Sequence, residues 1–267
     1  MENIQKKGFS KFTLDAIKAA KLGGFILKKG FKTHFKIKKK SGTHNLVTEY
    51  DYKSEKAIIS FIKKNYKDHK ILSEEYGKID SKSDYEWIID PLDGTVNFAH
   101  QIPVFCVSIA LSYKKEVISG AIYNPLLDEL FSAEKSKGSY CNGKRMRVTK
   151  TKNLNDAFLS SGFPYTLKKN PDRTIERFTN ILNLGLPIRR LGSAALDIAY
   201  VADGRFDIFW ETNLRAWDVA AALLMLKEAD GEVSNYDGSN FEMKDKNALV
   251  ASNKLLHKQF LKEFNKL

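Results

Sequence analysis

Two aspartates three residues apart are the feature of this sequence most suggestive of chemistry. Asp90 and Asp93 lie in the segment DPLDGT, directly after the apolar run Trp87–Ile89. The pattern predicts a strand that ends at Asp90, a turn at Gly94 and a helix that begins at Thr95. Two carboxylates at the end of a buried strand repel each other and lose hydration, so a cation should hold them. Oxygen ligands alone favour a hard ion such as Mg²⁺ over zinc. Two purely structural Asp turns are the alternative.

Acids from two other segments could join this pair. Glu74 and Glu75 follow the short apolar run Ile71-Leu72, and Asp218 follows Trp217 at the start of an apolar helix. Strand ends and helix starts of an α/β sheet meet at one edge, where ligands bind. We therefore expect four acids from three distant segments to meet there. The alternative for Asp218 is a first-turn acid that interacts with the helix dipole.

Four stretches of the sequence carry a family signature. They are LSEEYG (Leu72–Gly77), WIIDPLDGTVNFAH (Trp87–His100), LGSAALDIAYVADGRFDIFWE (Leu191–Glu211) and LRAWDVAAALLMLKEADG (Leu214–Gly231). Together they resemble the inositol monophosphatase family of Mg²⁺-dependent sugar-phosphate phosphatases, and the third is most similar to bacterial members. The DPLDGT and WD motifs in combination are highly specific, and the resemblance spans nearly the whole chain.

The resemblance implies two Mg²⁺ ions, or three when a more weakly bound ion is present. The ligands of the first ion match Glu74, Asp90 and the backbone carbonyl of Leu92. Those of the second match Asp90, Asp93 and Asp218. Asp51 matches a position that supports the third ion through water, and its alternative role is that of an N-terminal helix acid.

The resemblance also implies how a phosphate ester would be bound and attacked. Glu74, Thr95 and Asp93 match catalytic positions, where Thr95 and Glu74 orient a water that attacks phosphorus directly. The residues that match substrate contacts are Gly94 and Thr95 through their N–H groups, Ser193 and Ala194, Glu211, and Lys40. The implied enzyme is a phosphoric monoester hydrolase acting on myo-inositol monophosphate, sensitive to lithium and homodimeric.

The same hydrolysis could act on three alternative substrates: fructose-1,6-bisphosphate, a 3′-phosphoadenosine nucleotide and histidinol phosphate. The glutamate in FWE and the continuation NFAH favour the inositol type. The sequence departs from the family at Gln101 and Asp230, where small glycine residues are usual, so the local turns there need another explanation.

The elements that would position these residues alternate along the chain. Helices are expected over Ser10–Lys29 (capped by Ser10), Tyr52–Tyr66, Asp172–Leu184, Ser193–Ala202, Trp217–Ala229 and Lys254–Phe264, and the segments Val104–Tyr113, Val117–Tyr123, Glu129–Ala133 and Gly138–Tyr140 form an antiparallel meander. Strands are also expected at Lys70–Ser73, Tyr85–Ile89, Ala157–Ser161, Ile188–Leu191, Arg205–Trp210 and Ala248–Ser252. This order predicts a layered α/β (α+β) architecture.

The family resemblance sharpens that architecture to a sugar-phosphatase-type αβαβα sandwich. We expect one domain over residues 1–267, with an α+β half at 1–150 and an α/β half at 151–267. There is no membrane-length apolar run and no apolar N-terminal signal region, and the two cysteines, Cys106 and Cys141, are expected as free thiols. A cytoplasmic location is therefore expected, without a membrane partner.

The net charge of +12 raises a hypothesis of another class. Residues 1–70 contain 18 Lys, no Arg and 6 acidic residues, so the whole excess lies in the first quarter of the chain. An RNA- or partner-binding role for this basic region is the alternative function. Nucleic acid is not expected as the main partner, because aromatic residues are not interleaved with the basic run Lys36–Lys40, which is interpreted as a loop or strand edge.

Overall fold

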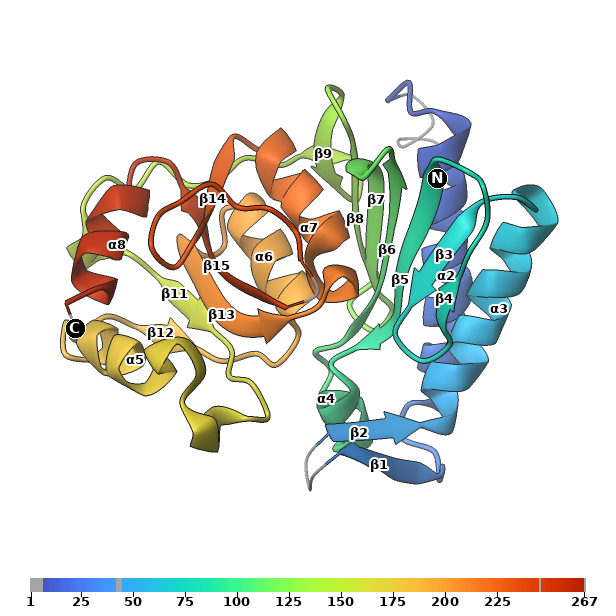
Figure 1. Cartoon of the computed structure of the whole chain (residues 1–267), viewed down its shortest axis with the longest axis horizontal. Coiled ribbons are helices and arrows are strands. Elements are labelled where there is room, and N and C mark those ends of the chain that lie inside the picture. The colour runs from blue at the N-terminus through green and yellow to red at the C-terminus, as the bar shows by residue number, and fades with distance from the viewer. Residues whose placement is uncertain (1–6, 42–44, 245, 267) are drawn as a thin grey trace.

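The computed structural model describes residues 7–41, 45–244 and 246–266. Its helices and sheets stack in alternating layers (Figure 1). The first layer consists of α2 (Lys11–Gly30) and α3 (Glu49–Asn65), which pack against each other. Apolar side chains such as Ile17 of α2 and Ile58 of α3 are buried toward the neighbouring sheet, and exposed lysines lie on the outer side, as an amphipathic surface helix requires.

An eight-stranded sheet forms the second layer. Its spatial order is β10-β9-β8-β7-β6-β5-β3-β4, in which β3 and β5 pair in parallel and the other neighbours pair antiparallel. The strands are β3 (Lys70–Ser73), β4 (Gly77–Ile79), β5 (Tyr85–Asp93), β6 (Cys106–Tyr113), β7 (Glu116–Asn124), β8 (Glu129–Glu134), β9 (Gly138–Cys141) and β10 (Lys144–Arg145).

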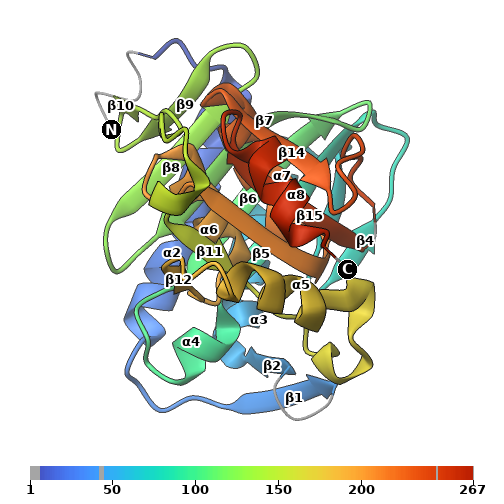
Figure 2. The same ribbon diagram turned by 90° about the vertical axis from the view of Figure 1, so that its left-hand side faces the viewer.

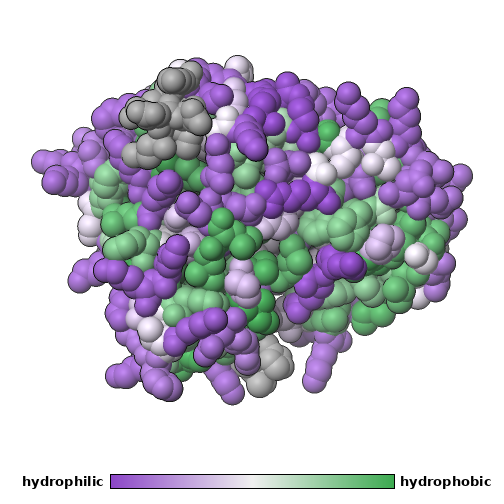
Figure 3. Space-filling model, turned by 180° about the vertical axis from the view of Figure 1, so that it is seen from behind, coloured by the Kyte–Doolittle hydropathy of each residue, from purple (hydrophilic) through white to green (hydrophobic). Residues whose placement is uncertain are grey.

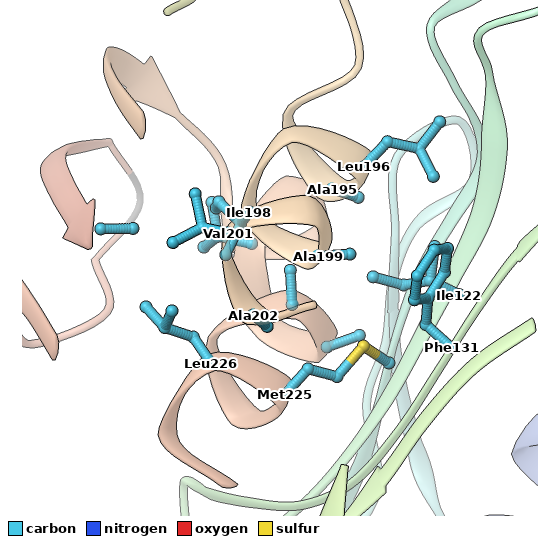
Figure 4. Packing of buried hydrophobic residues seen from close by; sticks show 14 of the residues in the cluster. Ile122, Phe131, Ala195, Leu196, Ile198, Ala199, Val201, Ala202, Met225 and Leu226 are labelled. Atoms are coloured by element: carbon cyan, nitrogen blue, oxygen red, sulfur yellow. The ribbon is translucent and has the colours of Figure 1, made fainter. Parts of the chain in front are cut away.

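Two apolar helices, α6 (Ala194–Ala202) and α7 (Ala216–Glu228), form the central layer. All nine residues of α6 are buried, because the helix lies between the two large sheets. In Figure 4, Leu196 and Ala199 point toward Ile122 and Phe131 of the eight-stranded sheet, whereas Ile198 and Val201 point the other way. A helix that is apolar on every side is typical of such an interior layer.

A five-stranded sheet and two outer helices complete the stack. The sheet has the order β12-β11-β13-β15-β14, and its outer face is covered by α5 (Thr174–Leu182) and α8 (His257–Phe264). The strands are β11 (Leu159–Ser161), β12 (Ile188–Arg189), β13 (Ile208–Leu214), β14 (Gly231–Asn235) and β15 (Asn247–Asn253). Short 3₁₀ turns lie at Leu154–Asp156, Leu167–Lys169 and Pro171–Arg173.

A small hairpin and a short helix lie beside this stack, below the large sheets in Figures 1 and 2. The hairpin pairs β1 (Ile37–Ser41) with β2 (Asn45–Thr48), and β2 contacts α4 (Thr95–Ala99). The hairpin leads directly into α3, whose first turn is capped by Thr48. Most of the basic run Lys36–Lys40 therefore lies on the strand that pairs with β2, the strand in contact with α4.

The order helix, sheet, helix, sheet, helix confirms the predicted layered architecture, and β6 to β9 form the predicted antiparallel meander. Cys106 and Cys141 are free cysteines, as expected. Within the described residues, no helix is both long and apolar enough to cross a membrane.

Several predicted boundaries were wrong for identifiable reasons. β5 continues through Pro91 to Asp93 with a shift in register after Asp90, where we expected the strand to end. α3 begins at Glu49, before the expected Tyr52, because Thr48 and Asp51 form a capping box. Ser10 precedes α2, yet its hydroxyl donates to Glu134 instead of capping the helix.

Other outcomes concern polar segments. One interpretation was right: the basic run Lys36–Lys40 lies mostly on β1, an edge strand of the hairpin. The helix expected from Asp172 begins at Thr174, because Asp172 has a left-handed φ of 53°. The terminal helix begins at His257, not Lys254. The short strands β4 and β14 were not predicted, because neither carries an apolar run long enough to stand out.

Candidate active site

The centre of the site is the end of β5. Asp90 is buried, and its Oδ1 accepts a hydrogen bond from the Leu92 N–H at 2.9 Å. Asp93 Oδ2 accepts from the Ser193 hydroxyl at 2.6 Å and from the Ala195 N–H at 2.8 Å. These two bonds tie the end of β5 to the start of α6. They also place Ser193 and Ala194, two predicted substrate contacts, beside Asp93.

The turn from β5 into α4 requires glycine. Gly94 has a φ of +95°, and a Cβ there would lie 2.8 Å from the Val104 carbonyl oxygen. Only glycine meets both demands without strain. The Thr95 hydroxyl, at the first position of α4, lies 3.0 Å from each of two acceptors, the Leu92 carbonyl and Asp51 Oδ1. The predicted helix start at Thr95 is therefore confirmed.

Glu74 follows β3, which pairs in parallel with β5, so both strands deliver their acids to the same edge. The backbone N–H of Glu74 donates to the Ile89 carbonyl at 3.2 Å. Its carboxylate accepts from Lys40 Nζ at 2.8 Å, and the same ammonium also contacts Glu75. Burial alone would lower the pKa of Lys40, but Glu74 and Glu75 outweigh burial and raise it. Lys40 thus contacts two acids at this edge of the sheet, and its role in phosphate binding stays a prediction.

Asp218 lies in the first turn of α7, where its Oδ2 accepts a hydrogen bond from the Arg215 N–H at 2.7 Å. Burial raises the pKa of Asp90 and of Asp218 well above the usual range, and the charges of Glu74 and Asp93 raise both further. Burial also raises the pKa of Asp93 to about 6, although its bonds from Ser193 and Ala195 oppose the shift. The four predicted acids therefore share one strongly negative, largely buried region.

Asp51 is fully buried and caps the N-terminus of α3. Its Oδ2 accepts from the backbone and hydroxyl of Thr48 at 2.8 and 2.6 Å, which completes the capping box. Its Oδ1 faces the Thr95 hydroxyl. Burial raises the pKa of Asp51 to about 6, and the hydrogen bonds from Thr48 hold it lower than burial alone would. The structure thus gives Asp51 the helix-capping role and links it to the site through Thr95.

Glu211 lies on β13 of the five-stranded sheet. Burial raises its pKa to about 8, and the charges of Asp197 and Asp93 act in the same direction. Its carboxylate packs directly against Gly162, which follows β11. The first half of the chain thus supplies the acidic strand ends, and the second half supplies Glu211 and the turn at Ser193.

The donor set fits a hard divalent cation. It consists of carboxylates and the Leu92 carbonyl, the oxygen ligands that Mg²⁺ prefers. Within the described ranges, no three His, Cys, Asp and Glu side chains are already arranged around a common metal position. Glu74 is paired with Lys40, and Asp93 and Asp218 accept protein N–H or O–H groups. A metal would have to compete with these partners.

Sequence reasoning missed some residues that border the site. Glu55 anchors the turn after β3, since its Oε1 accepts from the N–H groups of Glu75 and Tyr76 at 3.0 and 2.9 Å. Asn97 Nδ2 donates to the carbonyls of Val104 and Leu191 at 2.7 and 2.8 Å. Cys106 Sγ lies 3.9 Å from Asp93 Oδ2. Asn97 was inside a recognised motif, but no local signal marks its distant partners.

Comparison with known proteins finds relatives that match most of the chain. An inositol-1-monophosphatase of Mesorhizobium japonicum is 41% identical over 226 residues, which cover 84% of this chain and 85% of that protein. The Nus factor SuhB of Pseudomonas aeruginosa is 42% identical over 220 residues, covering 80% of this chain and 81% of the relative. The crystal structure of the extragenic suppressor protein suhB from Bartonella henselae superposes with a TM-score of 0.91 at 36% identity, covering 96% of this chain and 99% of that one.

The inositol monophosphatase family description matches residues 10–267. With relatives of about 40% identity over most of the chain, this match confirms both the resemblance and the predicted enzyme class. The chain therefore belongs to the inositol monophosphatase family, a family of phosphoric monoester hydrolases.

Proposed function

We propose that this protein is a Mg²⁺-dependent phosphatase that hydrolyses a myo-inositol monophosphate to inositol and phosphate. The observation that carries the proposal is the convergence of Glu74, Asp90, Asp93 and Asp218 from three segments into one region, in which Asp90 is buried and the other three are half-buried. Like charges this close destabilise one another unless cations or protons neutralise them. Family membership favours the cation.

The proposed ligands divide into two sets. Glu74, Asp90 and the Leu92 carbonyl would hold one ion, and Asp90, Asp93 and Asp218 a second, so that Asp90 would bridge them. Asp51 would support a third ion only if its carboxylate left the capping box. Bound Mg²⁺ would neutralise charge on the transferring phosphoryl group and make its attacking water more acidic.

The remaining groups bind and orient the reactants. Thr95 and Glu74 would orient the attacking water, since the Thr95 hydroxyl already lies between the Leu92 carbonyl and Asp51. The N–H groups of Gly94 and Thr95, at the start of α4, would bind phosphate oxygens, and Lys40 would add a positive charge nearby. Ser193, Ala194 and Glu211 would receive hydroxyl groups of the inositol ring.

The substrate is tested by comparing kcat/KM, with Mg²⁺ saturating, for inositol 1-phosphate and the three rival esters: fructose-1,6-bisphosphate, a 3′-phosphoadenosine nucleotide and histidinol phosphate. We expect the highest value for inositol 1-phosphate. A rival turned over at least about tenfold better would assign the protein to that substrate, because a tenfold preference corresponds to about 1.4 kcal/mol of transition-state binding.

A second candidate function is binding of RNA or a protein partner by the basic first quarter of the chain. Relatives named Nus factor SuhB favour it, together with the exposed lysines on the outer faces of α2 and α3. The test is RNA affinity at increasing salt concentration. A steep loss of affinity with salt would support contacts to phosphates. Absence of binding even at low salt would eliminate RNA as the partner.

Homodimerisation, lithium inhibition and a cytoplasmic location remain predictions. The first is tested by the molar mass in solution, which should equal twice the 30.4 kDa of the chain. A mass of one chain at micromolar concentration would contradict it. Lithium inhibition is tested by the rate of phosphate release in lithium chloride against sodium chloride, and the location by fractionating cells.

A further inference from the structure

A hollow of about 400 Å³ lies on the eight-stranded sheet, away from the carboxylate cluster. Four lysines, two acids and one serine line it: Lys70, Lys78, Lys114, Lys115, Asp84, Glu86 and Ser112. Lys70 and Glu86 lie at the starts of the parallel strands β3 and β5, whereas Glu74 and Asp93 lie at the other ends of these strands. From its start, β5 runs toward α4 (Figure 1). The hollow is therefore separate from the candidate active site.

The strand register places the hollow on the inner face of the sheet, the face that packs against the central helices. Lys70 pairs with Glu86, and Glu86 pairs with Ser112, so these three side chains point to the same face. Ile88, two residues further along β5, is packed against the central helices on that face. Trp87, between them, is buried on the opposite face under α2 and α3. The hollow therefore continues the inner face of the sheet beyond its apolar part.

The positive charges of this hollow are only partly neutralised. Lys78 pairs with Asp80 at 3.3 Å on the exposed surface. Among the residues that the structure describes, no acid forms an ion pair with Lys70, Lys114 or Lys115. The two acids that line the hollow offset half of its four positive charges, so a net charge of +2 remains. Like charges gathered in one place repel one another, and a bound anion would relieve that repulsion.

The turn that carries Lys114 and Lys115 has an unusual sequence for its shape. It joins β6 to β7 as a two-residue hairpin loop, and the two lysines have left-handed φ values of 49° and 69°. Asn-Gly is the preferred pair for such a turn, because both positions require a positive φ. Lysine is strained there, and strain of this kind concentrates at functional sites. The Lys114 N–H donates to the Asp84 carbonyl at 2.9 Å, which holds the turn beside the start of β5.

We propose that this hollow is a second anion site, which binds the diphosphate group of a small molecule. Lys70 and Lys78 lie on one side of β5 and Lys114 and Lys115 on the other, with neighbouring strands about 4.8 Å apart. Two linked phosphate groups, one toward each pair of ammonium groups, match this arrangement better than a single phosphate. The volume is that of a small-molecule site, which favours a free diphosphate or a nucleoside diphosphate over a nucleic-acid strand.

The first test is calorimetric binding of inorganic pyrophosphate to the full chain in EDTA. Without divalent cations the carboxylate cluster of the active site repels anions, so binding there does not interfere. We expect one site per chain, with an affinity at least about tenfold above that for orthophosphate. ADP is the second probe: an equal affinity assigns the site to the diphosphate group alone, and a higher one to a nucleoside diphosphate. A pyrophosphate affinity no higher than that for orthophosphate, or binding of a short RNA but not of pyrophosphate, would overturn the proposal.

The double variant Lys114→Asn with Lys115→Gly separates this site from general surface charge. It should weaken pyrophosphate binding at least about tenfold without lowering Tm, because Asn-Gly suits a turn with positive φ at both positions. The control is Lys28→Gln with Lys29→Gln, which removes the same charge from the exposed end of α2 and should leave the affinity unchanged. Equal losses of affinity in the two double variants would show that general surface charge attracts the anion, and would overturn the site.

Lys70→Gln tests the opposite side of the hollow, with Lys67→Gln on an exposed lysine before β3 as the matched control. Lys70→Gln should weaken pyrophosphate binding about tenfold, and the control should leave it unchanged. An unchanged affinity in Lys70→Gln would contradict a ligand that contacts lysines on both sides of β5. None of these measurements uses turnover, so they would still decide the anion site if the chain hydrolysed no phosphate ester.

Discussion

The four carboxylates proposed as metal ligands already have partners in the protein. Asp93 accepts from Ser193 and Ala195, and Asp218 accepts from the Arg215 N–H. These hydrogen bonds fix where the oxygen atoms point, but they supply no positive charge. Lys40 supplies a positive charge, but only next to Glu74. The net negative charge that remains is the physical reason to expect divalent cations.

A direct prediction concerns Asp218 and Asp93. Asp218→Asn or Asp93→Asn should keep the fold, because the amide has the same shape and can accept the existing hydrogen bonds through its oxygen. Each should lower the Mg²⁺-dependent rate by more than about 100-fold, as expected when transition-state charge loses its support. Steady-state kinetics with Mg²⁺ and circular dichroism check both statements. Full activity in either variant would refute the assignment.

Asp197 of α6 gives a prediction on stability. It is buried, and its Oδ1 has no hydrogen-bond partner among the described residues. Burial raises its pKa well above the usual range, although Ser160 opposes the shift. In the folded state Asp197 therefore keeps a proton that it releases above about pH 4 in the unfolded state. The free energy of unfolding consequently falls as the pH rises from about 4 toward the raised pKa of the folded state. Asp197→Asn removes this dependence.

The measurement is Tm of Asp197→Asn and of the wild type between pH 5 and pH 8. The difference in favour of the variant should grow as pH rises. A constant difference over this range would show that Asp197 is ionised in the folded protein at pH 5 and would contradict the account.

At the scale of elements, short irregular segments connect the layers into one site. The β1–β2 hairpin positions Lys40 so that its ammonium donates to Glu74. Asn97 of α4 donates to the carbonyls of Val104 and Leu191. The second contact links the loop before α6 to the helix that follows β5. Phe98 of α4 is also fully buried in the core below the eight-stranded sheet, so apolar and polar contacts together position this helix.

Lys40→Ala should have two opposite effects. Half-saturation by Mg²⁺ should occur at a lower concentration, because the Glu74 carboxylate loses its competing ammonium. KM for the phosphate ester should rise about two- to tenfold, because a positive charge near the phosphate is lost. Lys39→Ala, on the neighbouring exposed residue of the same strand, is the control and should change neither. Identical behaviour of the two variants would refute the role of the hairpin.

Asn97→Ala should loosen the connection between α4 and the loop before α6. Removal of two buried hydrogen bonds costs about 1–3 kcal/mol, or about 2–10 °C in Tm. KM should also rise, because the loop carries Ser193. Asn155→Ala, on an exposed turn, should be neutral. A variant with reduced Tm and unchanged KM would limit Asn97 to a structural role.

The sequence predicted the layers and the four central acids, because apolar periodicity and the DPLDGT and WD motifs are local signals. It missed contacts that depend on distant partners. Glu55 is indistinguishable in sequence from any helix acid, and Gly162 from any strand-end glycine. Gln101 and Asp230, which replace the usual small residues, adopt left-handed φ values of 60° and 67°, so their turns keep the shape that glycine would give.

At the scale of the whole molecule, the net charge of +12 comes from the lysine-rich first quarter of the chain. Lysines of α2 and α3 are exposed or half-buried, and some pair locally, such as Lys18 with Asp15 and Lys53 with Glu49. Figure 3 shows hydrophilic side chains scattered over the whole rear face, with apolar ones exposed between them. Among the lysines of this region that the structure describes, only Lys40 forms an ion pair with an acid of the site. The excess charge is therefore mainly a surface property that can steer anions.

The stack of layers has one functional consequence for the whole chain. The eight-stranded sheet supplies Asp90 and Asp93, the central helices supply Ser193 and Asp218, and the five-stranded sheet supplies Glu211. The proposed metal half and polyol half of the site therefore come from opposite sides of the central layer. Neither half of the chain contains the complete site.

The central claim is that this carboxylate cluster works through a bound divalent cation. The most direct test is phosphate release from inositol 1-phosphate by the purified chain after removal of metals with EDTA, followed by addition of Mg²⁺. The account predicts loss of turnover in EDTA, recovery with Mg²⁺, and no recovery in Asp218→Asn. Turnover that continues at the same rate in EDTA would contradict it.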